Sequence, residues 1–307
     1  MRRWLLWGGT ALVLGLAAAE AGLRWGVGLG DPPLAVLDAA VEYRLVPDAS
    51  YSRWGNRIDI NRHGLRGPRI NDAAAPKTRR VLLIGDSIVY GTNFLDQAET
   101  ISARLTARLA DDPRLAGCAP QAIAMGVSSW GPVNQAAFLA RLGPFDADTA
   151  AILVSAHDLY DVPRDDGADI LPYRLHPSHT AIGDAATIAA ERLLRRETPP
   201  PAGFFARAEA ETLAALDAMA AYLAEAGVPV TLVYHPTVTE RAGAPSPQKA
   251  RFEDWAAGAG LPVLDLASAL PAPGGYRDDI HPDADGADRI AGALAEVLTL
   301  DLAPCGP

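Results

Sequence analysis

The most regular feature of the chain is an alternation, from residue 81 onward, of short continuous apolar runs with longer amphipathic stretches. A short continuous apolar run is typical of a strand buried on both faces of a parallel sheet, and apolar residues that recur every three or four positions are typical of a helix. Strands that alternate with helices predict right-handed crossovers and an α/β fold with a mainly parallel, five-stranded sheet. The expected strands are Val81–Ile84, Gln121–Val127, Ala150–Val154, Val230–Tyr234 and Val263–Leu266, and the expected helices are Ala98–Leu109, Val133–Leu142, Ala206–Ala226, Ser246–Ala257 and Asp283–Leu298.

A second apolar pattern lies at the start of the chain, where Arg2 and Arg3 precede the uncharged run Trp4–Ala19. As a helix, this run would span about 24 Å, slightly less than the ~30 Å hydrocarbon core of a bilayer. It is typical of a signal peptide cleaved after Ala17-Ala18-Ala19, or of an uncleaved anchor that continues through Leu23. We favour the anchor because the helical pattern passes the cleavage motif without a break. Both alternatives export the rest of the chain, and a third, a buried core helix, does not.

Breaks in these patterns divide the chain into four parts. A signal-anchor or transmembrane helix is followed by a connector with an irregular cap, then by the main α/β domain with a long, proline-rich polar insertion, and finally by a short tail. The boundaries of these parts are 1–26, 27–80, 81–300 with the insertion at 159–205, and 301–307.

Some regular structure is also expected within the less regular parts. Tyr43–Val46 and Arg57–Ile60 in the cap have the alternation of strands, and the insertion has helical character at Ala185–Arg195. The insertion is expected to cover the edge of the sheet or to contribute to a substrate pocket.

Composition and charge then exclude several classes of protein. Hydrophobic residues make up 49% of the chain, enough for a sizeable core, and the formal charge is −10. Residues 1–26 carry three arginines and one glutamate, so the remainder carries −12. No basic run is present, which excludes a nucleic-acid partner. An acidic domain is also repelled by anionic lipid, which leaves the N-terminal helix as the expected membrane contact.

The chain has only two cysteines, Cys118 and Cys305, which excludes a disulfide-rich scaffold and a cysteine-rich zinc module. In an oxidising compartment the pair could form a disulfide that fastens the tail, and the alternative is two unpaired thiols. No metal site or cofactor is expected.

Polar residues that follow the apolar runs are the first candidates for a site, because ligands bind outside the carboxyl ends of parallel strands. Ser87 follows the first run and could act as a nucleophile. His281, near the last helix, could be its base, with Asp278 three residues earlier to orient the imidazole. His235, which also follows a strand, is a rival base without an acid three residues before it.

These residues stand in two sequence blocks that resemble those of the SGNH (GDSL-type) hydrolases. Gly85-Asp86-Ser87 with Gly91 resembles the first block, and Asp278-Asp279-Ile280-His281-Pro282 resembles the last. The resemblance covers roughly residues 80–298. The N-terminal part, with the stretch Ile58–Gly67, resembles membrane-anchored bacterial members of the family. The family implies a flavodoxin-like three-layer αβα sandwich and ester hydrolysis or acyl transfer, with Ser87 as nucleophile, His281 as base and Asp278 as its orienting acid.

The chain departs from the family pattern at the oxyanion hole, which the family builds from the N–H of the nucleophile, a glycine N–H and an asparagine side chain. The glycine position falls on Ser129, and His157 takes the asparagine position. A serine keeps the N–H, and a neutral imidazole donates from one nitrogen only. The expected oxyanion hole is therefore formed by Ser87, Ser129 and His157.

The resemblance therefore implies an exported serine esterase, held at the membrane by its N-terminal helix or secreted after cleavage. Its substrate would be an acylated small molecule or carbohydrate, such as O-acyl groups of the envelope. Two alternatives stay open, namely an O-acyltransferase of the same fold and a non-catalytic glycan-binding relative with an altered oxyanion hole. The motifs of α/β-hydrolase elbows, P-loops, zinc proteases and dinucleotide-binding folds are missing from the sequence.

Overall fold

The computed structural model describes residues 2–163, 178, 180–194, 199–270 and 274–305. At its centre lies a five-stranded sheet in which every neighbouring pair is parallel, in the order β6-β5-β7-β8-β9. The chain runs from β5 to β6 on one side and then returns to β7 on the other, which is the flavodoxin-like order. The predicted fold class is thus confirmed. The strands are β5 (Thr78–Gly85), β6 (Ala119–Gly126), β7 (Thr149–Val154), β8 (Val230–Tyr234) and β9 (Val263–Asp265).

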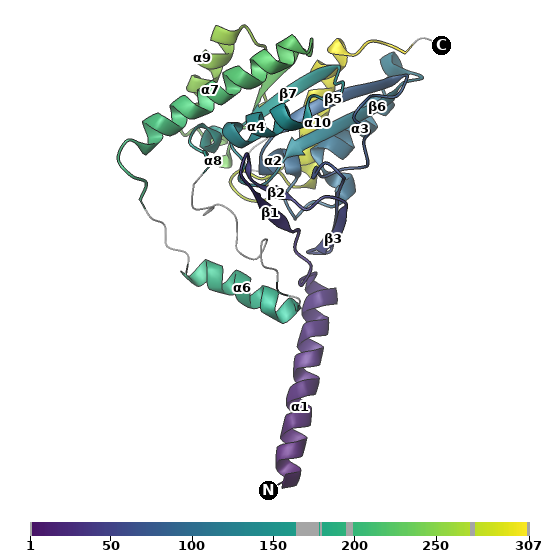
Figure 1. The fold of residues 1–307 in the computed structure, drawn as a ribbon, viewed down its shortest axis with the longest axis vertical. Coiled ribbons are helices and arrows are strands. Elements are labelled where there is room, and N and C mark those ends of the chain that lie inside the picture. Colours follow the sequence, from purple (N-terminus) through teal and green to yellow (C-terminus); the bar gives the residue numbers. More distant parts are fainter. Residues whose placement is uncertain (1, 164–177, 179, 195–198, 271–273, 306–307) are drawn as a thin grey trace.

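Helices cover both faces of this sheet and make it the middle of three layers (Figure 1). Because neighbouring residues of a strand point to opposite faces, the continuous apolar run of β5 supplies both cores. Val81 and Leu83 pack in one core and Leu82 and Ile84 in the other. The first core is closed by α3 (Ile101–Ala110) and α10 (Ala284–Leu298), and the second by α4 (Pro132–Leu142), α7 (Phe204–Glu225) and α9 (Pro247–Ala259).

The predicted strands and helices of this body all occur, with ends that differ by at most three residues. In the insertion, the helix expected at Ala185–Arg195 is α6 (Ala181–Leu194), and residue 195 lies outside the described residues. The remaining short elements are α2 (Ser87–Tyr90), η2 (Gln97–Glu99), η3 (Pro113–Leu115), η4 (Ala156–Leu159), α8 (Val238–Arg241) and η5 (Thr299–Asp301).

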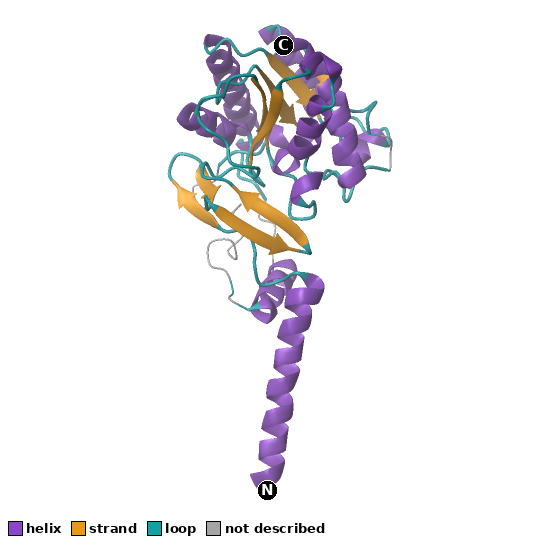
Figure 2. Ribbon diagram, turned by 90° about the vertical axis from the view of Figure 1, so that its right-hand side faces the viewer, coloured by secondary structure: helices purple, strands orange, loops and turns teal. Residues whose placement is uncertain are grey.

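The segment expected to be an irregular cap is instead largely regular, because it consists of two antiparallel hairpins. Figure 2 shows both hairpins between the α/β body and the N-terminal helix. The alternation noted at Tyr43–Val46 and Arg57–Ile60 corresponds to the second strand of each hairpin. The first strand of each was not predicted, because segments of four or five residues show few alternations. The strands are β1 (Ala35–Asp38), β2 (Glu42–Leu45), β3 (Ala49–Arg53) and β4 (Asn56–Ile60).

The N-terminal helix projects away from the folded body (Figure 1). It consists of α1 (Arg2–Ala21) and a π-helical turn, η1 (Gly22–Val27). Within the stretch Leu6–Val27, an 18-residue window has a mean hydropathy of 1.4, and none of its residues is buried. The helix is therefore long and apolar enough to cross a membrane. Its exposure rules out the alternative of a buried core helix.

Cys118 and Cys305 form a disulfide bond, with their Cα atoms 5.3 Å apart. The bond joins residues 187 positions apart and fastens the segment after η5 beside the start of β6. Disulfides persist in oxidising compartments, so this bond and the exposed apolar helix together indicate export.

We expect removal of the disulfide to destabilise the domain, because a cross-link over a long loop restricts the unfolded chain. Replacing both Cys118 and Cys305 by serine should lower the free energy of unfolding by about 2–5 kcal/mol, measured by denaturant unfolding of the full chain in detergent. Reduction of the unchanged protein should give the same loss. Equal stability of the oxidised, reduced and double-serine forms would contradict the prediction.

Candidate active site

The site lies where the strand order reverses, at the carboxyl end of the inner strand β5. The chain leaves β5 for β6 on one side and β7 on the other, so the loops that follow these strands diverge and leave room for a ligand. Ser87 is the second residue after β5 and begins the short helix α2. It is 7% exposed.

Asp86 shapes the turn that presents Ser87. Its Oδ1 accepts a hydrogen bond of 2.8 Å from the N–H of Ile88, which caps α2. The turn also lies against the next strand, since a Cβ added at Gly126 would come within 2.8 Å of the carbonyl oxygen of Asp86. The sequence Gly-Asp-Ser and the glycine that ends β6 are therefore needed by the same tight strand-to-helix turn.

The three residues predicted as a triad are brought together by hydrogen bonds. Ser87 Oγ lies 2.9 Å from His281 Nε2, and His281 Nδ1 lies 2.8 Å from Asp278 Oδ2. An ionised carboxylate can only accept, so Nδ1 donates to Asp278 and leaves Nε2 free to accept from the serine hydroxyl. This is the arrangement that a nucleophile, a base and an orienting acid require.

The loop that carries His281 is held by its own backbone. Asp278 Oδ1 accepts from the N–H groups of Ile280 and His281, at 3.0 and 2.8 Å, so the acid and the base are joined twice. A Cβ at Gly286 would come within 1.9 Å of the Gly275 carbonyl oxygen, which explains the glycine four residues after Pro282. The loop therefore folds back on α10 and points the imidazole at Ser87.

The hydrogen bonds of Asp278 also govern its charge. Burial tends to raise the pKa of the carboxyl, but the N–H groups of His281 and its ring outweigh that effect and lower the pKa. Asp278 is therefore ionised at neutral pH and can stabilise a positive charge on His281 when the imidazole takes a proton.

Ser129 adopts the backbone conformation that the family's glycine would favour. Its φ is +62°, in the left-handed region where a side chain is unfavourable. Among the residues that the structure describes, neither the N–H of Ser129 nor that of Ser87 is donated to another group. Both are therefore available to an incoming oxyanion.

The first cap hairpin holds this loop in place. Tyr43 donates its hydroxyl to the carbonyl oxygen of Ser128 at 2.6 Å, and the fully buried Trp130 donates its indole N–H to the carbonyl oxygen of Tyr43 at 3.1 Å. The residues on both sides of Ser129 are thus fastened to β2, which explains how a strained serine conformation persists.

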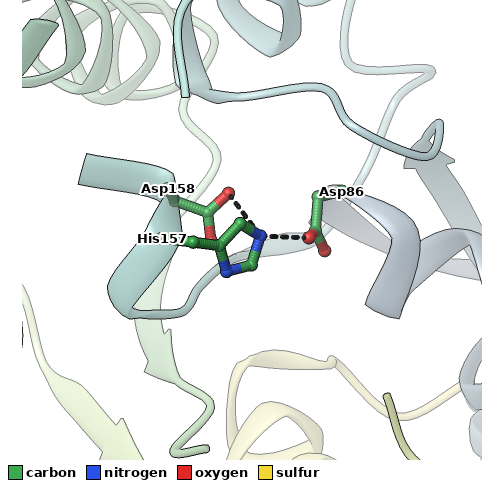
Figure 3. Close-up of side chains that lie close together, drawn as sticks. All are labelled: Asp86, His157 and Asp158. Atoms are coloured by element: carbon green, nitrogen blue, oxygen red, sulfur yellow. Dashed lines mark hydrogen bonds and ion pairs between the residues drawn. The ribbon is translucent and has the colours of Figure 1, made fainter. Parts of the chain in front are cut away.

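His157 turns one ring nitrogen toward two carboxylates. Its Nε2 lies 3.0 Å from Asp86 Oδ2 and 3.9 Å from Asp158 Oδ1, as Figure 3 shows. Its Nδ1 is buried and has no partner among the described residues. The contact arises because β5 and β7 are neighbours, so the residues that follow them meet. Asp86 Oδ2 is also 3.3 Å from Ser87 Oγ.

These contacts determine the charges beside the nucleophile. Burial opposes a charge on His157, but Asp158 and Asp86 outweigh it and raise the pKa of the imidazole to about 10. Burial raises the pKa of Asp158 well above its usual value, whereas the hydrogen bond and charge of His157 overcome burial at Asp86 and lower the pKa there. The group is therefore best described as an Asp86–His157 ion pair beside the buried Asp158.

The same three side chains bring potential metal ligands within 4.8 Å of one another. A metal ion would, however, have to displace the proton that joins His157 Nε2 to Asp86. The raised pKa of His157 favours that proton, so the residues fit an ion pair better than a metal.

The rival base His235 lies apart from the hydrogen bonds that join Ser87, His281 and Asp278. It is fully buried, and its Nδ1 is 3.1 Å from the carbonyl oxygen of Pro236. Burial lowers the pKa of this imidazole to about 4, which keeps it neutral.

Sequence reasoning missed Arg66, which holds the loop that follows the nucleophile. The buried guanidinium donates to the carbonyl oxygens of Tyr90, Thr92 and Leu95, at 3.2, 2.5 and 2.7 Å. Arg66 lies in the Ile58–Gly67 stretch that suggested a family resemblance, but no feature of that stretch indicates its partners. Arg66, which follows the hairpin β3-β4, therefore fixes the position of the loop that follows the nucleophile.

Comparisons with known proteins agree with this geometry. The family model of the GDSL-like lipases/acylhydrolases matches residues 83–289, so the chain belongs to this family. The protein is thus a hydrolase of the SGNH type that acts on esters. No curated protein sequence matches the chain.

The solved structures to which the chain is similar are distant in sequence. An aryl esterase from M. smegmatis is 16% identical, with 72% of this chain and 99% of the esterase covered and a TM-score of 0.44. A carbohydrate acetylesterase family member from Sinorhizobium meliloti is 17% identical, with 73% and 98% covered and a TM-score of 0.39. An alpha/beta hydrolase from the metagenome of Lake Arreo, Spain, is 18% identical, with 73% and 95% covered and a TM-score of 0.46.

The raised pKa of His157 predicts how stability depends on pH. A basic group whose pKa is higher in the folded state stabilises fully below its unfolded value of about 6.5, and the stabilisation is lost as the pH rises through about 10. The free energy of unfolding should therefore fall between these pH values in the unchanged protein, and fall less in His157→Asn. Urea unfolding at a series of pH values measures both. Parallel curves for the two proteins would refute the prediction.

Proposed function

We propose that the protein is an exported serine esterase in which Ser87 is the nucleophile, His281 the general base and Asp278 the residue that orients the base. The observation that carries this proposal is the continuous hydrogen-bonded series Ser87–His281–Asp278, with distances of 2.9 and 2.8 Å. Ser87 stands at the point of the fold where ligands are expected, and the carboxylate beyond the imidazole is ionised.

The reaction follows from this arrangement. Ser87 Oγ attacks the ester carbonyl carbon while its proton passes to His281 Nε2, and the resulting imidazolium is stabilised by Asp278. When the tetrahedral intermediate collapses, His281 returns the proton to the leaving alcohol and an acyl-enzyme remains on Ser87. Water, deprotonated by the same imidazole, then releases the acid and restores the serine hydroxyl.

The negative charge that develops on the carbonyl oxygen needs donors. We assign this role to the N–H groups of Ser87 and Ser129, with His157 as the third member of the oxyanion hole. In the resting structure the imidazolium of His157 is held by Asp86, 3.0 Å away, so its positive charge lies near the nucleophile and is partly balanced by that carboxylate. A preorganised donor or charge of this kind stabilises the transition state more than the substrate.

We further propose that α1 is retained as a membrane anchor. Glu20, the residue after the cleavage motif, accepts hydrogen bonds of 2.8 and 3.0 Å from the N–H groups of Ala181 and Ile182, and it pairs with Arg24 at 2.9 Å. The end of the helix is therefore part of the folded structure. Removal of residues 1–19 would leave Glu20 without the helix that positions it.

The substrate class follows from location and chemistry. An anchored, exported esterase meets the esters of the cell envelope, and its acidic domain, with a formal charge of −12, is repelled by anionic lipid surfaces. We therefore propose O-acyl groups of envelope carbohydrate as substrates. An acyltransferase would use the same acyl-enzyme and pass the acyl group to a sugar hydroxyl. The assembled triad favours both catalytic forms over a non-catalytic glycan-binding protein.

Replacing the nucleophile tests the proposal directly. Ser87→Ala should abolish covalent labelling by a fluorophosphonate and lower the turnover of a short aryl ester by about 10³-fold or more. Ser52→Ala, which alters an exposed serine in the cap hairpin β3-β4, is the matched control and should retain both activities. Full esterase activity in Ser87→Ala would overturn the proposal.

Two substitutions test the role of His157. His157→Ala removes the charge and should lower kcat by about 10²–10³-fold, the usual cost of losing an oxyanion donor. His157→Asn restores the amide that the family uses and should retain kcat within about tenfold of the unchanged protein. Steady-state kinetics with a short aryl ester give both values. Undiminished activity in His157→Ala would exclude the role, and a large gain in His157→Asn would indicate a weakened site.

A further inference from the structure

A cavity of about 430 Å³ lies between α6 and the segments that hold Leu29 and Trp54. Its volume is within the range of sites for small organic ligands. Apart from one arginine its lining is apolar, so it suits a ligand without hydrogen-bonding groups. It is lined by Leu29 and Trp54 and by five residues of α6, namely Ala185, Ile188, Ala189, Arg192 and Leu193.

The α6 wall of this cavity is fixed to the end of the N-terminal helix. The carboxylate of Glu20 accepts from the first two N–H groups of α6, those of Ala181 and Ile182. One turn later, the buried Asp184 forms an ion pair with Arg53 of the cap and accepts from the N–H of Gly30 at 2.7 Å. The helix α6 is thus held to the end of the N-terminal helix by hydrogen bonds and to the cap by an ion pair.

The opposite wall is built on the residues that immediately follow the apolar helix. The N–H of Leu29 donates to the carbonyl oxygen of Leu23, and the N–H of Trp54 donates to the carbonyl oxygen of Gly28, both at 3.0 Å. Both walls are therefore held by hydrogen bonds to residues 20–28, around the end of the apolar stretch.

The position of these walls relative to a bilayer follows from the length of the helix. A hydrocarbon core of ~30 Å takes about 20 helical residues, so a span that starts at Trp4 ends near Leu23. Glu20, Arg24 and the start of α6 then lie within about one helical turn of that end, at the boundary between the hydrocarbon and the lipid headgroups. Figure 1 shows α6 extending sideways from the end of α1, below the folded body.

The exposed side chains at this level are those that favour the boundary of a membrane. Trp25 is 82% exposed and Leu193 is 83% exposed. Tryptophan is enriched where lipid headgroups meet the hydrocarbon, and an exposed leucine beside an apolar cavity gains by contact with lipid. Arg192 is exposed and has no carboxylate partner among the described residues, so it can meet a phosphate.

We propose that this cavity binds an acyl chain of a phospholipid from the leaflet at which α1 leaves the bilayer. The proposal rests on the anchor described under the proposed function, and it concerns a site separate from Ser87. Because the folded domain is strongly acidic, attraction between charges does not hold it to the surface, and the apolar chain provides the contact instead. The bound lipid would fix the orientation of the domain beside its anchor.

The test uses the full chain in vesicles of phosphatidylcholine and phosphatidylglycerol that contain a phosphatidylcholine with a diazirine on its acyl chain. After irradiation, labelled peptides are identified by mass spectrometry. We expect label on α1, which lies in the bilayer, and also on α6 and on the peptide that contains Trp54. Label on α1 but on neither cavity wall would overturn the proposal. Absence of label from α1 as well would overturn the anchor and the proposal together.

Two matched variants separate the cavity from general exposure. Ala189→Trp places a large ring at an exposed position of the cavity wall and should remove most of the label from the Trp54 peptide while α1 stays labelled. Ala214→Trp makes the same change at an exposed position of α7 and should leave the labelling unaltered. Unchanged labelling in Ala189→Trp would also overturn the proposal. Turnover of a soluble aryl ester should be the same in both variants, so that a failure of catalysis is detected separately.

Discussion

The hydrogen bond between Ser87 and His281 is the contact that the rest of the molecule is arranged to make, because it joins residues 194 positions apart. It forms only if β5 lies between β6 and β7 and if the loop before α10 returns to the carboxyl end of that strand. The packing of α10 on α3 brings the loop to this edge, and the close approach of Gly286 to Gly275 folds it back. The fold thus holds the imidazole of His281 within 3 Å of the hydroxyl of Ser87.

A second constraint is the acid that precedes the nucleophile. Asp86 caps α2 through one oxygen and meets both His157 and Ser87 through the other. A carboxylate buried this deeply is costly unless a positive group compensates it, and the imidazolium of His157 does so. The replacement of the family's asparagine by histidine therefore changes the electrostatics beside the nucleophile as well as the donor. An asparagine would leave the charge of Asp86 to be balanced by hydrogen bonds alone.

Local patterns predicted much of this arrangement. The four apolar residues at Val81–Ile84 identify a buried strand without further information, and Asp278 and His281 are close enough in sequence for a single turn to join them. The pairing of Asp86 with His157 could not be predicted, because it depends on β5 and β7 being neighbours and on a rotation of the imidazole. The partners of Arg66 are backbone carbonyl groups, which carry no signature in a sequence. The cap strands β2 and β4 were expected from their alternation, but β1 and β3 were missed because segments of four or five residues give few repeats of a pattern.

The short connection between the helix and the domain has a consequence for how an anchored enzyme would find its substrate. The N–H of Leu29 donates to the carbonyl oxygen of Leu23 and the N–H of Trp54 to that of Gly28, so hydrogen bonds fix the connection between the apolar helix and the catalytic body. In an anchored enzyme, Ser87 would therefore be held at a constant height above the lipid. Esters that lie in one layer of the envelope are within its reach, and those in deeper or more distant layers must first move into that layer. The position of Ser87 would thus limit which esters reach the site before the side chains of the site discriminate among them.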